Sequence, residues 1–235
     1  AISGSAPLPP DTAHRFQKVT GTEIIERYGS TEAAIITAIP PGTTGRRGWV
    51  GWPLPGVRGR VTNENGHFES AATGVLETLG HNVFTGYWNR VAGDTFTDDG
   101  WFVTGDVAEI DNQGCVRILG RETDVVISGG LNVYPKEVED ILDQAPGIAG
   151  SAVFGVPHPD FGEAVTAVVE SPDPTSFDEN ACISYLKKDL ASFKVPRRII
   201  PVETIPRNEL GKVAKAALKE SYRGLFDIQK DRSNT

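Results

Sequence analysis

Three short motifs between Trp101 and Glu139 carry side chains that could bind a nucleotide. The first is Thr104-Gly105-Asp106, where a short apolar strand is expected to end in a turn with the carboxylate at its tip. A carboxylate held on rigid backbone is a good acceptor for the paired hydroxyls of a ribose. In the second motif, Arg121 follows a glycine turn and supplies a cation. We therefore expect an acceptor and a cation near the same place.

The third motif is the loop Ser128-Gly129-Gly130, expected between a strand at 125–127 and a helix that begins at Pro135. A glycine pair lets a ligand chain approach the backbone closely. Proline at the first helical position, followed by acidic residues, is a strong helix start. Each motif alone is typical of an ordinary turn. Three of them in fixed order within about forty residues favour a binding site.

A fourth motif, Arg27-Tyr28-Gly29-Ser30-Thr31-Glu32, is expected to follow a short strand at 23–26. A strand that ends in a glycine turn projects its next side chains from the edge where ligands of open α/β sheets bind. Tyr28 offers a flat face for a base, Thr31 a hydroxyl for a phosphate, and Glu32 an oxygen ligand for Mg²⁺. Alone, the same motif describes a turn and a helix start with Ser30 or Thr31 as the N-cap.

These motifs need elements that position them. Residues 1–45 predict a helix from Pro10 to Val19, with Phe16 and Val19 facing inward. Residues 48–120 predict an all-β region that forms a small distorted barrel. Its strands are expected at 57–61, 74–79, 101–103, 107–110 and 116–119.

A second domain is expected at 123–225, a compact α+β unit of about 100 residues. It predicts helices at 135–144, 178–190 and 213–222, and strands at 149–156, 164–170 and 198–202. Residues 226–235 are expected to form a polar tail. Gly211-Lys212 stands where the last helix is expected to start, and without further context Lys212 is a surface cation.

The composition describes an ordinary soluble globular protein, with 39% hydrophobic and 23% charged residues among 235. The net charge of -8 makes nucleic acid a poor default partner. The segment from Lys187 to Lys219 nevertheless holds nine basic and three acidic residues, which suits a phosphorylated small molecule or a solvated face. Two cysteines in no metal-like spacing fit a reducing compartment. No segment is apolar enough to span a membrane, and the chain, which has no Met, is expected to be a processed or truncated piece.

With these motifs in this order, the chain resembles the adenylate-forming enzymes: acyl-CoA synthetases, adenylation domains of peptide synthetases, and luciferases. In that family the equivalents of Asp106 and Arg121 hold the ATP ribose. The resemblance assigns Tyr28 to adenine stacking, Thr31 to a phosphate and Glu32 to the metal. It also implies nucleotide contacts for Ser5, Ala6, Arg27 and Gly29.

The resemblance further implies a small mobile domain after a hinge at Thr123. From that domain Lys212 would contact the carboxylate and the α-phosphate during adenylation. The loop Ser128-Gly129-Gly130 would line the pantetheine path, and Arg197 and Arg198 would contact CoA phosphates.

The malonyl-CoA synthetase branch is the most similar, through three stretches at 26–29, 132–139 and 155–165. Arg27 could fork onto a second carboxylate of the substrate, or form a structural salt bridge with Glu26 or a neighbour. The chain departs from the family at 74–76 and 79–81. It also has Thr123 where relatives carry Asp or Lys, and no phosphate-binding loop rich in Ser, Thr and Gly.

The resemblance thus implies a mixed α+β fold: residues 1–122 as part of a large adenylating domain, with the distorted barrel at about 46–120, and residues 123–225 as the small domain. The implied function is an ATP-dependent acid–CoA ligase for malonate or a similar small dicarboxylate, which uses ATP, Mg²⁺ and coenzyme A. The alternatives are a ligase for another acid, an adenylation domain that loads a carrier protein, or a catalytically silent fragment that binds a nucleotide or a partner. We expect a cytoplasmic protein, with the mitochondrial matrix as the alternative. We also expect that an amino-terminal half of the enzyme is missing, and that the chain forms no acyl-CoA without it.

Overall fold

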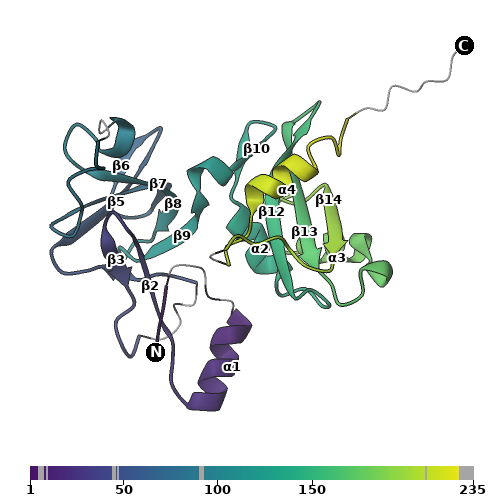
Figure 1. The fold of residues 1–235 in the computed structure, drawn as a ribbon, viewed down its shortest axis with the longest axis horizontal. Coiled ribbons are helices and arrows are strands. Elements are labelled where there is room, and N and C mark those ends of the chain that lie inside the picture. Colours follow the sequence, from purple (N-terminus) through teal and green to yellow (C-terminus); the bar gives the residue numbers. More distant parts are fainter. Residues whose placement is uncertain are drawn as a thin grey trace, which may run out of the picture. The chain divides into compact units, whose positions relative to one another are not determined.

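The computed structural model describes residues 1–4, 8, 10–43, 46, 48–89, 93–209 and 211–227 (Figure 1). The chain divides into two compact units, Ala1–Glu122 and Thr123–Thr235. Within the described ranges, unit 1 has two sheets and unit 2 has one, and each unit has its own apolar cores, so helices and strands combine in both. Among the described residues, every helix is too short or too polar to cross a membrane.

The first sheet of unit 1 has four strands in the order β1-β2-β3-β4. These are β1 (Ile2–Ser3), β2 (Ile25–Ser30), β3 (Ala34–Ala38) and β4 (Trp52–Pro53). Helix α1 (Pro10–Thr20) precedes β2, as predicted. The expected inward orientation of Val19 is wrong, because its side chain is 84% exposed in the last turn, while Phe16 is half-buried.

The second sheet of unit 1 is antiparallel, with five strands in the order β6-β5-β7-β8-β9. These are β5 (Val57–Asn63), β6 (Gly66–Phe68), β7 (Ala72–Gly80), β8 (Phe102–Ile110) and β9 (Val116–Arg121). The 3₁₀ turn η1 (Gly93–Thr95) lies between β7 and β8. The predicted barrel at 46–120 is wrong, because this sheet stays open: the edge strands β6 and β9 do not pair in the described part of the chain. Closure needs long tilted strands at both edges, and β6 has three residues.

Two apolar clusters hold the sheets of unit 1 together. One gathers Val61, Leu76, Ala108, Ile110 and Val116, and the other gathers Ala33, Ile36 and Phe102. Tyr28 of β2 packs against both clusters. A backbone bridge between Gly51 and Val116 also joins the segment before β4 to β9. The side chains that end β2 are therefore fixed relative to β8 and β9.

Unit 2 begins within the short 3₁₀ turn η2 (Glu122–Asp124). It contains a five-stranded sheet with the path β11-β10-β13-β12, in which β14 pairs with β13. The strands are β10 (Val126–Ser128), β11 (Leu131–Val133), β12 (Gly150–His158), β13 (Gly162–Glu170) and β14 (Arg198–Val202). Strand β14 has its predicted bounds. The hairpin β10–β11 replaces the predicted loop, since Gly129-Gly130 is the two-residue turn that such hairpins favour.

Helices cover both faces of this sheet (Figure 1). They are α2 (Pro135–Leu142), α3 (Glu179–Leu186), α4 (Lys215–Ser221) and the 3₁₀ turn η3 (Pro174–Ser176). Alternation along β12 explains the layers: Val153 faces the cluster with α2 and α3, whereas Phe154 faces the cluster with Leu218 of α4. Helices α2 and α3 therefore lie on one face and α4 on the other.

Candidate functional site

Asp106 lies within strand β8 and not at the tip of a turn, which corrects the prediction for this motif. The strands expected at 101–103 and 107–110 form one continuous strand. The chain does not reverse between them, because a β-bulge accommodates Gly105 at φ +69°. The Thr104 hydroxyl donates to the Leu76 carbonyl at 2.7 Å and accepts from the Asp106 N–H at 3.1 Å. This hydroxyl replaces a hydrogen bond of the ladder between β7 and β8 at the bulge. The bulge interrupts the alternation of side chains between the two faces of β8 and so sets the direction of the Asp106 carboxylate.

Two side chains from other strands donate to the Asp106 carboxylate. The Tyr28 hydroxyl lies 2.5 Å from Oδ2, and Arg121 Nε lies 2.9 Å from Oδ1. Asp106 is 9% exposed, whereas the Arg121 side chain is 58% exposed. Burial, followed by the charge of Asp106, raises the pKa of the Tyr28 phenol, which therefore remains a donor at neutral pH. The structure thus brings three predicted residues together as an anion with an aromatic ring on one side and a cation on the other.

The turn after β2 presents Thr31 and Glu32. The alternative of a helix start at this turn is wrong, because strand β3 begins at Ala34. The Tyr87 hydroxyl donates to Glu32 Oε1 at 2.8 Å and lowers the pKa of this carboxyl group. The Asn82 side chain donates to the Ala33 carbonyl at 2.7 Å, so the segment 82–87 supports the turn from outside. Thr31 remains exposed and Glu32 half-exposed.

Glu32 has the chemistry of a magnesium ligand, although the described residues contain no cluster of three or more His, Cys, Asp or Glu side chains. Mg²⁺ commonly takes one or two protein carboxylates together with substrate phosphates. A lowered pKa keeps Glu32 ionised, and its place on a turn leaves room for phosphate oxygens. One carboxylate of this kind fits a metal that arrives with its nucleotide.

Arg27 and Gly29 flank Tyr28 on β2. Arg27 packs closely against Gly4, and it makes no ion pair within the described part of the chain, so the salt bridge with Glu26 is not found there. Gly29 is required by space, because a Cβ would collide with the Ala34 carbonyl oxygen. Ser5 and Ala6, predicted as nucleotide contacts, lie outside the described residues.

In unit 2, the predicted CoA contacts fall into two groups. The Gly129 N–H donates to the Phe161 carbonyl at 2.9 Å, and the Arg197 guanidinium lies 4.3 Å from the Phe161 ring centroid. Phe161 therefore links the hairpin turn at Ser128-Gly129-Gly130, whose two glycines are exposed, to Arg197. Arg198 is directed elsewhere, because its Nε pairs with Glu179 at 3.1 Å.

Lys212 lies on a tight turn and not at the helix start, because α4 begins at Lys215. A bridge between Arg207 and Val213 closes this turn, and the Lys212 N–H donates to Asn208 Oδ1 at 2.9 Å. The Lys212 side chain is exposed and makes no hydrogen bond or ion pair with the described residues. Thr123 lies in η2, where its carbonyl accepts from Lys219 Nζ at 3.4 Å.

Sequence reasoning missed the supporting residues Asn82, Tyr87 and Thr104. The first two belong to the stretch 80–88, in which the residue types alone indicated no binding role. Thr104 was noticed as part of a turn motif, but its role depends on Leu76, which only the folded sheet brings into reach.

Comparisons with known proteins bear on both units. The model of the AMP-binding enzyme family matches residues 1–88, and the model of the AMP-binding enzyme C-terminal domain matches residues 137–212. The malonate–CoA ligase of Arabidopsis thaliana is 36% identical over an alignment of 236 positions, which covers 94% of this chain and 38% of that protein. The long-chain-fatty-acid–CoA ligase of Salmonella typhimurium is 34% identical over 230 residues, 97% of this chain and 41% of its own length.

The crystal structure of ATP-bound MatB from Rhodopseudomonas palustris is similar in fold, with a TM-score of 0.88 and 46% identity. The match covers 96% of this chain and 46% of that one. The chain therefore spans less than half the length of these relatives.

Proposed function

The chain belongs to the family of AMP-binding enzymes, and from this premise we propose that its whole protein is an adenylate-forming acid–CoA ligase. In the first step, a carboxylate oxygen bonds to the α-phosphorus of ATP while the bond from that phosphorus to the pyrophosphate oxygen breaks. In the second, the CoA thiol loses its proton, its sulfur bonds to the acyl carbon, and AMP leaves. The products are AMP, pyrophosphate and the thioester.

The observation that carries this proposal is the Asp106 carboxylate between Tyr28 and Arg121. A nearly buried anion repels phosphate, so the ligand groups that suit it are hydroxyl donors such as those of a ribose. Tyr28 adds an aromatic surface for a base, and Arg121 adds a cation beside the sugar. Because Glu32 is also ionised, it would meet phosphates only through a cation, which favours MgATP over a free nucleotide.

The remaining roles in adenylation go to Thr31, Glu32 and Lys212. Thr31 would donate its hydroxyl to a phosphate, and Glu32 would hold Mg²⁺, which supplies positive charge for the phosphates when bound. Lys212 would stabilise the charge that develops as the carboxylate meets the α-phosphate. Its exposed, uncommitted side chain supports this role, because the ammonium does not have to leave a described protein partner first.

For thioester formation we propose the hairpin turn Ser128-Gly129-Gly130 and Arg197. The two glycines of the turn are exposed, and a chain as thin as pantetheine can lie against glycine backbone. Arg197 stacks on Phe161 beside this turn and keeps its donors available for phosphate. Arg198 is the weaker candidate, because its guanidinium already bonds to Glu179.

We propose malonate or a similar small dicarboxylate as the acid. The relatives named malonate–CoA ligase and the likeness to MatB support this choice. Arg27 supports it chemically: it adjoins Tyr28, and it has no carboxylate partner in the described part of the chain. A guanidinium without an internal partner can bind the second carboxylate of the substrate in a forked geometry.

The test is ATP–pyrophosphate exchange by the whole protein with a panel of acids, with and without CoA. Arg27→Ala should weaken transition-state binding of malonate by about 2–4 kcal/mol, the scale for removing one partner of a buried charge pair. Transition-state binding of acetate and propionate should weaken much less. Arg58→Ala, on an exposed arginine paired with Glu69, is the control. An equal loss on every acid would refute the substrate proposal.

A second candidate is a ligase for a different carboxylic acid, favoured by the similarity to long-chain-fatty-acid–CoA ligase. The same panel of acids separates the two candidate ligases. A ligase for another acid would show pyrophosphate exchange with a monocarboxylic acid, and Arg27→Ala would leave this exchange unchanged. A carrier-loading adenylation domain would show exchange without any response to CoA. Nucleotide binding without exchange for any acid would refute the ligase proposal altogether.

A further inference from the structure

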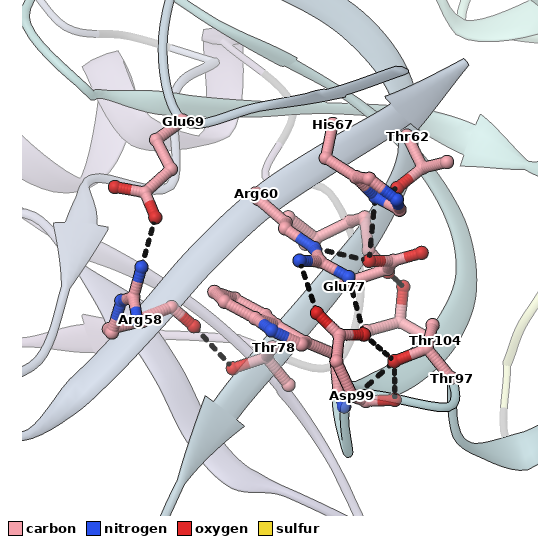
Figure 2. Close-up of polar contacts among 12 residues, drawn as sticks. Arg58, Arg60, Thr62, His67, Glu69, Glu77, Thr78, Thr97, Asp99 and Thr104 are labelled. Carbon is pink, nitrogen blue, oxygen red and sulfur yellow. Dashed lines mark hydrogen bonds and ion pairs between the residues drawn. The ribbon is translucent and has the colours of Figure 1, made fainter. Parts of the chain in front are cut away.

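An ion cluster in unit 1 joins two strands of the second sheet to the turn before β8 (Figure 2). Arg60 of β5 places Nε at 2.6 Å from Glu77 Oε2 of β7. Its two terminal nitrogens bond to both oxygens of Asp99, at 2.9 and 3.1 Å. The side chains of Arg60 and Glu77 are 9% and 5% exposed, whereas Asp99 is 59% exposed. One guanidinium therefore connects β5, β7 and the turn that precedes β8.

The same turn is fastened to β8 by further contacts. The Thr97 hydroxyl donates to Asp99 Oδ1 at 2.7 Å and accepts from the Trp101 N–H at 2.9 Å. The Trp101 ring lies 4.2 Å from the Arg60 guanidinium carbon. Arg60 also lowers the pKa of Asp99 to about 2, so this carboxylate stays ionised at neutral pH. The start of β8 thus has a fixed position relative to β5 and β7.

The cluster lies directly before the bulge that orients Asp106. Glu77 pairs with Val103 in the ladder, and the register shifts between Glu77 and Val75. Leu76, between those two residues, accepts the hydrogen bond from Thr104 that in turn holds the Asp106 N–H. A shift of Val103 against Glu77 would move the bulge and with it the Asp106 carboxylate.

Apolar patterning alone defines this register weakly. Asp106, Val107 and Ala108 are buried in succession, so the alternation that normally distinguishes the two faces of a strand is missing there. A slip of one residue turns every side chain to the opposite face. Directional contacts to a buried charge can supply the missing specificity even where they add little stability.

We propose that the Arg60–Glu77–Asp99 cluster is a positioning device for the nucleotide site, which fixes the register of β8 so that Asp106 faces Tyr28 and Arg121. The ribose role of Asp106 rests on the proposed function, whereas the positioning itself does not. Arg60, Glu77 and Asp99 act through Asp106 and are not catalytic residues.

The experiment has two measurements. NMR hydrogen exchange follows the Asp106 amide in residues 1–235, and a binding assay measures the Kd for AMP in the whole protein that contains these residues. The test variants are Arg60→Lys, which keeps the charge but loses the fork, and Asp99→Asn. Both should raise the exchange rate of the Asp106 amide and the Kd for AMP by about tenfold or more, the scale of one lost hydrogen bond to a charged group. Thr104→Val, which deletes the acceptor of that N–H, is the positive control, and Thr104→Ser should restore protection.

Glu69→Gln is the matched negative control. Its partner Arg58 lies on the same strand as Arg60 and 5.0 Å from the same Trp101 ring, but that ion pair is exposed. This variant should leave exchange and Kd within about twofold, as expected for an exposed pair.

The proposal is overturned if the test variants lower the stability of unit 1 while the Asp106 amide keeps its protection relative to its neighbours. Should Arg60→Lys fail to fold, Asp99→Asn decides, because it changes one atom of a largely exposed side chain. If the wild-type protein does not bind AMP but the Asp106 amide responds to both variants, the proposed function fails and the positioning stands.

Discussion

The bond between Tyr28 and Asp106 gives the sharpest prediction, because phenylalanine removes one hydroxyl and leaves the ring in place. Tyr28 packs against both apolar clusters of unit 1, and Tyr28→Phe preserves that packing. The change deletes the 2.5 Å donor to Asp106 Oδ2 and leaves Arg121 on the other oxygen. The main perturbation is therefore the loss of a hydrogen bond to a nearly buried carboxylate.

The magnitude follows from the charge of the acceptor. Hydrogen bonds to charged groups contribute about 1.5–3 kcal/mol, and we expect a loss of about 2 kcal/mol in the free energy of unfolding of unit 1. With a urea m-value near 2 kcal/mol per M, the midpoint should fall by about 1 M. Tyr87→Phe is the matched control on a 44% exposed ring, and it should stay within about 0.5 kcal/mol of wild type.

The assay can isolate unit 1 within the intact chain. All four tryptophans, at positions 49, 52, 88 and 101, lie in unit 1 and none lies in unit 2. Tryptophan fluorescence during urea unfolding therefore reports the unit that contains Tyr28. Far-UV circular dichroism on the same samples follows both units.

A pH series tests the same bond independently. Burial and the Asp106 charge raise the pKa of Tyr28 in the folded state, whereas an unfolded tyrosine ionises near its ordinary pKa of about 10. Above that pH the unfolded state loses the proton first, so this contribution to stability is complete below pH 10 and falls as pH rises. Wild type should have a larger free energy of unfolding than Tyr28→Phe at pH 8. At pH 11 this difference between the two proteins should be smaller by about 1.4 kcal/mol. An unchanged midpoint at pH 8, or a difference that does not vary with pH, would refute the reasoning.

Three other predictions concern the remaining roles. Lys212→Ala should cripple acyl-AMP formation by the whole protein and spare thioester formation from supplied acyl-AMP; equal losses in the two half-reactions would contradict its assignment. Glu32→Gln should raise the Mg²⁺ concentration for half-maximal exchange by roughly tenfold without changing AMP affinity in EDTA, and a loss of AMP affinity would instead indicate a collapsed turn. Phe154→Ala, in the core of unit 2 at 0% exposure, should cost about 3–5 kcal/mol in circular dichroism unfolding, with the tryptophan transition of unit 1 unmoved.

The local elements were the most predictable part of the fold. Strand β14 and the start of α2 at Pro135 agree with the sequence pattern because apolar spacing and flanking prolines act over short distances. The mixed helix and strand content was confirmed as well. The hairpin β10–β11 was missed, because Gly129-Gly130 satisfies both a ligand loop and a two-residue turn, and the sequence alone does not separate them.

The site was predictable in its members but not in its geometry. Tyr28 and Asp106 are 78 positions apart, and their contact depends on the packing of two sheets. The bulge at Gly105 was mistaken for a turn, because a glycine between a threonine and an aspartate is typical of both. Arg60 was hidden within a segment predicted as an apolar strand, and only the fold shows that its charge is buried against Glu77.

The described side chains also differ in how firmly they are held, and the difference matches the proposed chemistry. Asp106 is fixed by two donors and by the Thr104 bridge, so a ribose held there would keep one position through both steps. Thr31 and Lys212 are exposed, and the Lys212 ammonium has no partner among the described residues. Side chains that stabilise a charge developing during the reaction benefit from freedom to move toward that charge. The side chain that anchors the nucleoside benefits from rigidity. This contrast explains why mutation of the Asp106 support should change affinity, while mutation of Lys212 should change the rate of one step.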